Sequence, residues 1–169
     1  GYCIGGTLLT IALAHMAKHG DERIKSATFF TTLTDFEEAG ELGVFIDEDF
    51  LAAIEREVDG RGYLDSFFMS RTFSFLRAND LVYGPAVRSY MMGEAPPAFD
   101  LLFWNGDSTN LPALMAKEYL RKLYAGNDLA HDRFEVDGEA VKMADIKTPL
   151  FAVASESDHI APWRSSFTG

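Results

Sequence analysis

The sequence predicts an α/β protein whose core is interrupted by a helical insertion. Near its start, a glycine-rich turn leads into an apolar helix and then a strand, and a second apolar strand lies near its end. Alternation of helix and strand is typical of a parallel sheet. The chain has 169 residues, of which 47% are apolar and 13% aromatic. That is long and apolar enough for a packed core, so a disordered segment is excluded.

Residues 1–34 form the first part of the predicted core. The helix at residues 7–18 is apolar on almost every side, which predicts burial, and Gly20 is its expected stop. Residues 25–33 are rich in Thr and Phe and predict a strand. The chain starts inside a motif and without Met, so we expect it to be a piece of a longer protein that supplies a further strand before Gly1.

Residues 35–127 predict the helical insertion. Its clearest helix covers residues 48–58 with Asp47 as N-cap, and a second covers residues 112–124. Further signals are the proline pair, the predicted N-cap and stop of the second helix, and an aromatic stretch: Pro96, Pro97, Asn110, Gly126, Tyr63, Phe67, Phe68, Phe73 and Phe75. Ordinary packing of a small subdomain accounts for most of these aromatic residues.

Residues 128–169 return to the α/β pattern. Short alternating segments at residues 134–141 flank an Asp-Gly pair and predict a hairpin. The apolar run at residues 148–154 has the length of a buried strand. It leads into the loop at residues 155–162, and in open α/β sheets ligands and catalytic groups gather at such carboxyl ends of strands.

A nucleophile motif opens the chain. Residues 1–6, GYCIGG, fit the G-x-S-x-G turn of the α/β-hydrolase fold with Cys3 in place of serine. The flanking glycines relieve a cramped strand-to-helix turn, and the helix dipole at Cys3 favours a thiolate. The backbone N–H of Ile4 is the expected oxyanion donor. The alternative is that Cys3 is a small buried core residue.

Asp158 is the predicted acid of a catalytic triad. It follows a strand and lies far downstream of Cys3, in the nucleophile–acid–base order of the fold. Glu156 competes with it on sequence alone, and a solvated loop aspartate is the simpler alternative. The chain has four histidines, and none has the position of a triad base: His15, His19, His131 and His159. We therefore expect the base beyond Gly169.

Charge and cysteine content exclude several classes of function. The net charge of −11 argues against binding to a phosphate backbone or to anionic lipid. A single cysteine allows no intrachain disulfide, and no apolar run reaches the length of a membrane span. No metal site is expected.

Four segments, in order along the whole chain, resemble a known family. Residues 1–7 (GYCIGGT) resemble the lipase-like box of polyhydroxyalkanoate synthases. Residues 72–82 (TFSFLRANDLV) and 99–112 (FDLLFWNGDSTNLP) resemble signatures of their cap region, and residues 158–163 (DHIAPW) resemble their acid loop. The first and third segments look most like class I enzymes.

The resemblance implies an acyltransferase that builds a polyester from short-chain 3-hydroxyacyl-CoA, such as 3-hydroxybutyryl-CoA. It implies Cys3 as nucleophile, Asp158 as acid, a cap at about residues 35–127, and no cofactor beyond the CoA thioester substrate. Members of the family work as homodimers on cytoplasmic polyester granules. Two alternatives stay open: a cysteine-nucleophile thioesterase or hydrolase of the same fold, and a catalytically dead relative that binds granules.

Overall fold

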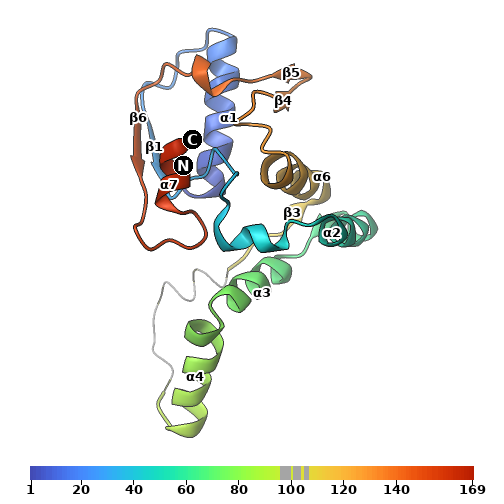
Figure 1. Ribbon diagram of the computed structural model, residues 1–169, viewed down its shortest axis with the longest axis vertical. Helices are drawn as coiled ribbons and strands as arrows, with labels where there is room; N and C mark the ends of the chain where they lie inside the picture. The colour runs from blue at the N-terminus through green and yellow to red at the C-terminus, as the bar shows by residue number, and fades with distance from the viewer. Residues whose placement is uncertain (96–99, 101–103, 105–106) are drawn as a thin grey trace. The chain divides into compact units, whose positions relative to one another are not determined.

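The computed structural model describes residues 1–95, 100, 104 and 107–169 (Figure 1). Pro96, Pro97 and residues 99, 101–103, 105 and 106 of the motif at residues 99–112 therefore lie outside the described residues. The chain divides into two compact units. One joins Gly1–Ala53 to Lys117–Gly169, and the other is Ile54–Ala116. Helices and a small parallel sheet are combined in the first unit, which confirms the α/β class.

Parallel strands form the sheet of the first unit. β1 (Ala27–Phe30) pairs in parallel with β6 (Leu150–Val153), and the two lie side by side in Figure 1. Tyr2 makes a parallel bridge to Phe30 of β1. Both strands were predicted and are shorter than their apolar runs. The burial predicted for residues 148–154 is wrong, because β6 has β1 as its one strand partner among the described residues and all four of its side chains are exposed.

The first helix, α1 (Ile4–Lys18), packs against this sheet. It starts three residues before the predicted helix, and the chain turns at Gly20 with φ 69°, as predicted. Leu13 forms a buried cluster with Ala27 and Phe29 of β1. The buried hydroxyl of Thr7 donates to the carbonyl of Leu33 at 2.6 Å, which fixes the start of the helix to the chain beyond β1.

Short helices follow β1. A 3-10 helix, η1, spans Gly40–Phe45, and α2 spans Glu48–Arg61. The predicted cap of α2 is confirmed, since the Asp47 carboxylate accepts a hydrogen bond of 2.8 Å from the N–H of Phe50. Satisfying this otherwise unpaired N–H defines where α2 begins.

The second unit is a small helical body. β2 (Tyr63–Leu64) pairs with β3 (Leu111–Pro112), and α3 (Ser66–Leu76) follows β2. After α3 come the π-helix η2 (Asn79–Tyr83), the short α-helix α4 (Gly84–Ala86) and the π-helix η3 (Val87–Met91). Its core is Val58, Leu64 and Ala116. Much of the predicted aromatic stretch is exposed, including Phe67 and Phe75.

The helix predicted at residues 112–124 consists of two parts. α6 (Ala113–Glu118) is a regular helix, and η4 (Tyr119–Ala125) continues it as a π-helix. The role predicted for Asn110 is wrong: its side chain accepts from the N–H of Ser66, at the start of α3, at 2.8 Å. Gly126 follows the last turn, as predicted.

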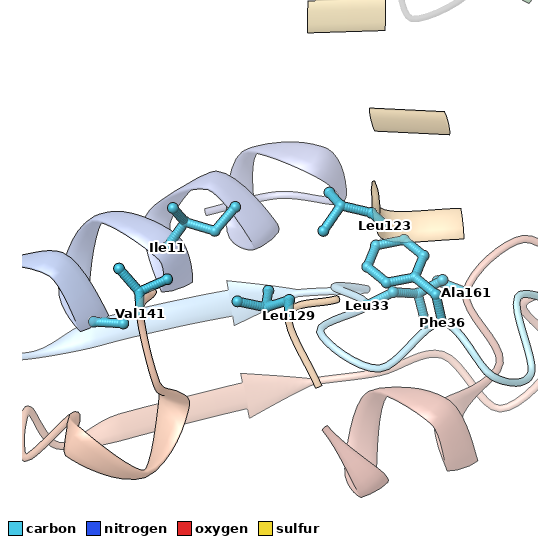
Figure 2. Close-up of a cluster of buried hydrophobic side chains, with 8 residues drawn as sticks. Ile11, Leu33, Phe36, Leu123, Leu129, Val141 and Ala161 are labelled. Atoms are coloured by element: carbon cyan, nitrogen blue, oxygen red, sulfur yellow. The ribbon is translucent and has the colours of Figure 1, made fainter. Parts of the chain in front are cut away.

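The predicted hairpin is confirmed. β4 (Glu135–Val136) pairs antiparallel with β5 (Glu139–Ala140) around Asp137 and Gly138, both with positive φ. A 3-10 turn, η5 (Met143–Asp145), precedes β6, and α7 (Trp163–Thr168) follows it. The largest buried cluster of the first unit combines residues of α1, of the segment after β1, of η4 and the turn after it, of the residue after β5 and of the loop after β6 (Figure 2): Ile11, Ala14, Leu33, Phe36, Leu123, Leu129, Val141 and Ala161.

Candidate active site

The predicted nucleophile and acid follow parallel segments of one sheet. Cys3 comes directly after Tyr2, which bridges to β1, and Asp158 lies in the loop after β6. Since the carboxyl ends of parallel strands meet at one edge, the topology brings both residues to the same edge of the sheet. The structure therefore brings together two side chains that are 155 positions apart in sequence.

Cys3 has the strained backbone of a nucleophile turn. Its φ is 48° and its ψ −124°, a conformation that residues with a side chain rarely adopt. Three backbone bonds hold it there: its N–H donates to Phe30 at 2.9 Å, and its carbonyl accepts from Gly6 at 2.9 Å and Thr7 at 3.3 Å. Hydrogen bonds to β1 on one side and to α1 on the other thus hold Cys3 in its strained backbone conformation.

The glycines around Cys3 differ in how much space a side chain would have at each position. A Cβ on Gly1 would overlap the Cα of Gly6, and a Cβ on Gly6 would overlap the side chain of buried Thr32. A Cβ on Gly5 would meet nothing within 4 Å. The expectation that both glycines of the G-x-C-x-G motif avoid crowding therefore holds for Gly1 and is wrong for Gly5, whose neighbour Gly6 is the tight position.

The Cys3 thiol is harder to ionise than a free thiol. Burial is the largest cause and raises its pKa, the N–H of Ile4 lowers it by facing the sulfur, and the carboxylate of Asp158 raises it further. The N–H at the start of the helix favours the thiolate, as predicted, but loss of hydration outweighs this effect, so the net pKa of the thiol is raised. The thiol of Cys3 is therefore protonated at neutral pH.

The loop of residues 155–162 orients Asp158. Its Oδ1 accepts from the N–H groups of Ile160 and Ala161, both at 2.9 Å, whereas Oδ2 accepts no hydrogen bond within the described part of the chain. Asp158 is half-buried and Glu156 is exposed. One carboxylate oxygen is thus fixed by its own loop, and the other is open to a further donor.

A neighbouring segment anchors this loop. The N–H of Glu41 donates to the carbonyl of His159 at 2.9 Å, and the hydroxyl of Ser165 donates to the carbonyl of Glu38 at 2.8 Å. Gly40 lies between these contacts with φ 61°, and a Cβ there would overlap the carbonyl oxygen of His159. Close approach of two backbones explains the glycine at this position.

The four histidines lie where the sequence predicts. His15 is eleven residues along α1 from Ile4, or about 16 Å at 1.5 Å per residue. The ring of His19 lies against that of His15 with centroids 4.4 Å apart and the planes tilted by 41°, and His131 hydrogen-bonds through Nδ1 to the carbonyl of Asn127 at 2.8 Å. Over residues 1–95 and 107–169, no histidine hydrogen-bonds Cys3 or Asp158.

Sequence reasoning missed a tyrosine pair near Cys3. Tyr119 and Tyr124 lie on η4, their rings are edge to face with centroids 5.2 Å apart, and the hydroxyl of Tyr119 donates to that of Tyr124 at 3.5 Å. A negative charge on Cys3 raises the pKa of both phenols, after the larger effect of burial. Residues five apart share a face only in a π-helix, so an α-helical pattern conceals the pair.

The described residues contain no group of three or more His, Cys, Asp or Glu side chains that could hold a metal ion. Nor does any helix in the described ranges have the length and apolar character needed to cross a bilayer.

Comparison with known proteins identifies relatives of the whole chain. It is 47% identical over 169 residues to the poly(3-hydroxyalkanoate) polymerase subunit PhaC of Rhizobium etli, and 46% identical to the poly(3-hydroxyalkanoate) polymerase of Methylorubrum extorquens. The chain is homologous to the poly(3-hydroxyalkanoate) polymerases. PhaC of Cupriavidus necator is 41% identical over 99% of the chain. The chain spans 27 to 29% of the length of these three polymerases. No protein-family model matches it.

Proposed function

We propose that the protein carrying this chain is a polyhydroxyalkanoate synthase that transfers 3-hydroxyacyl groups from CoA through Cys3 to a growing polyester. The observation that carries this proposal is the strained turn at Cys3, with the Asp158 carboxylate close enough to change the pKa of its thiol. Short-chain substrates such as 3-hydroxybutyryl-CoA follow from the class I resemblance.

The proposed step exchanges one thioester for another. A base takes the proton of Cys3, the sulfur attacks the acyl carbonyl, the bond from that carbonyl to the CoA sulfur breaks, and CoA leaves as a thiol with the proton. The N–H of Ile4 stabilises the oxyanion, and Asp158 orients the base. That base is a histidine outside these 169 residues.

A thiol suits this reaction better than a hydroxyl does. The acyl group on Cys3 keeps the reactivity of a thioester, so the hydroxyl that ends another acyl chain can attack it and form the ester bond. Water must be kept away, or hydrolysis replaces elongation. We assign this task to a cap at residues 35–127, which contains the compact unit Ile54–Ala116. The α/β-hydrolase fold is likewise proposed, and the parallel order of Tyr2, β1 and β6 supports it.

The remaining assignments come from the resemblance. We propose a homodimer at the surface of cytoplasmic polyester granules, with no cofactor beyond the CoA thioester. The names of the relatives support the polymerase activity.

The test uses the full-length protein that carries this sequence. We expect wild type to release CoA from 3-hydroxybutyryl-CoA, to form insoluble polymer and to carry radiolabelled acyl group on the peptide with Cys3. Cys3→Ala should abolish all three, and Cys3→Ser should leave little activity because its alkoxide is harder to form. Free 3-hydroxybutyrate without polymer would instead support a thioesterase, and label that persists in Cys3→Ala would overturn the assignment.

A further inference from the structure

The tyrosine pair on η4 has one hydroxyl proton with no acceptor among the described residues, and both phenols respond to the charge of Cys3. We propose that the hydroxyl of Tyr124 donates a hydrogen bond to the acyl group carried by Cys3, and that Tyr119 is the positioning residue that holds this hydroxyl in place. This inference rests on the proposed function, since it requires an acyl group on Cys3.

The pair is rigidly packed. The ring of Phe36 meets Tyr124 edge-on at 4.9 Å between centroids and Tyr119 at 6.5 Å, and Phe36 is only 4% exposed. The wide turns of η4 place the two tyrosines, five residues apart, on one side, with an i to i+5 bond of 2.8 Å from the N–H of Gly126 to the carbonyl of Arg121. The phenols therefore have little freedom to turn away.

An asparagine fixes Phe36 in turn. The side chain of buried Asn127 accepts from the N–H of Phe36 at 2.9 Å and donates to the Asp35 carboxylate at 2.8 Å. Asn127 lies two residues after the end of η4 and has φ 49°. Both sides of the aromatic contact, the segment after β1 and the end of η4, are thus tied together by one residue.

The pair lies at the end of the first unit that holds Cys3 and Asp158. Tyr119 and Tyr124 pack against the cluster that contains Phe36, Leu123 and Ala161, which Figure 2 shows close together. Ala161 belongs to the acid loop, and its N–H donates to Asp158. A charge on Cys3 raises the pKa of both phenols, which agrees with a position of the pair toward the sulfur.

Both phenols stay protonated at neutral pH. Burial raises the pKa of Tyr119 well above that of a free tyrosine and raises the pKa of Tyr124 too. The hydroxyl of Tyr119 donates its hydrogen bond to the hydroxyl of Tyr124. The proton of Tyr124 has no acceptor among the residues that the structure describes, although a half-buried hydroxyl ordinarily finds one. A 3-hydroxyacyl group on Cys3 offers two acceptors, its carbonyl and its hydroxyl oxygen.

The test compares Tyr124→Phe, Tyr119→Phe and the double variant in the full-length protein, with Tyr90→Phe as the control, because that hydroxyl is on a side chain that is 90% exposed. Two rates are measured: acylation of Cys3 by 3-hydroxybutyryl-CoA and alkylation of Cys3 by iodoacetamide. Tyr124→Phe should slow acylation about tenfold, the rate equivalent of one neutral hydrogen bond. Alkylation should stay within about twofold of wild type, since its reagent does not need the donor.

Tyr119→Phe should slow acylation by less, and should add nothing in the Tyr124→Phe background, because a positioning residue acts only through the group it positions. Acylation at the wild-type rate in Tyr124→Phe would overturn the proposal. Equal losses in both rates would also overturn it, because they indicate disturbed packing. If wild type itself takes no acyl label, the proposed function fails, and this outcome is distinct from either result with the variants.

Discussion

The ionisation of Cys3 depends on which groups surround its sulfur. Burial and the Asp158 carboxylate raise the pKa of the thiol, while the N–H of Ile4 lowers it. At neutral pH the sulfur is therefore protonated, and the attack that we propose requires a base. The charge of Asp158 opposes the thiolate, whereas in the proposed function the same carboxylate stabilises the protonated form of the base.

Replacing Asp158 should separate these two effects. Asp158→Asn removes the charge, so the pH midpoint of Cys3 alkylation should fall, since a negative neighbour no longer opposes the thiolate. Acyl transfer should nevertheless drop by orders of magnitude, about 10⁴ in the serine-protease precedent.

Glu156→Gln is the matched control, because Glu156 is exposed and should alter neither quantity much. His159→Gln should have at most an intermediate effect on acyl transfer. An unchanged alkylation midpoint in Asp158→Asn would show that Asp158 is too far from the sulfur to act on it.

Gly5 and Gly6 offer a second test at the scale of single residues. Gly6→Ala should destabilise the protein by about 1–3 kcal/mol, because the new Cβ overlaps Thr32 and buried sites tolerate extra volume poorly. Gly5→Ala, one position away in the same helix, meets open space and should be neutral or stabilising by up to about 1 kcal/mol. Urea unfolding midpoints measure both, and equal midpoints would contradict this account of the turn.

At the scale of elements, the acid loop depends on η1. The N–H of Glu41 donates to the carbonyl of His159, the hydroxyl of Ser165 in α7 donates to the carbonyl of Glu38, and Gly40 allows the close approach of η1 to the loop. The position of Asp158 therefore depends on a segment more than a hundred residues earlier in the chain. A change in η1 should alter the reactivity of the Cys3 thiol.

Gly40→Ala should destabilise the protein by at least about 1–2 kcal/mol, because φ is 61° and the added Cβ overlaps the carbonyl of His159. It should also slow acylation of Cys3 by shifting the acid loop. Gly43→Ala, in the same 3-10 helix, meets nothing within 4 Å and should change stability by less than about 0.5 kcal/mol. Chemical unfolding and the acylation rate are compared for the pair, and similar behaviour of the two variants would refute the role of Gly40.

Over the whole molecule, burial differs strongly between the two compact units. α1 has six buried residues, whereas α3, η2, α4 and η3 have none. Segments with few buried contacts open at lower free energy than the core does. The uneven burial therefore predicts uneven local stability.

Hydrogen exchange measured by mass spectrometry should show this difference. Amides of α1 and β1 should exchange slowest, and amides of α3 and of residues 79–91 should exchange at least about tenfold faster, since each 1.4 kcal/mol of opening free energy changes the rate tenfold. The hairpin of β4 and β5, which is also half-exposed, serves as an internal reference for fast exchange. Uniform protection across both units would contradict the prediction.

The sequence by itself determined the features that arise within a few neighbouring residues. Asp47 caps α2 through a bond three residues away, the Asp-Gly pair turns the hairpin, and the short motif around Cys3 places it between a parallel bridge and a helix. The resemblance to the polymerases was also predicted from short sequence segments, and the relatives confirm it. The roles of Cys3, Ile4 and Asp158 stay predictions.

Only the tertiary structure decided what depends on distant segments. The pKa of the Cys3 thiol rises because the folded chain buries the sulfur, and Asn110 accepts from the N–H of Ser66, at the start of α3, because β3 pairs with β2. Tyr119 and Tyr124 meet because η4 winds with the wider π-helical turn, a choice that pattern alone does not reveal. Burial and hydrogen bonding between remote residues are properties of the folded chain, and local propensity carries no information about them.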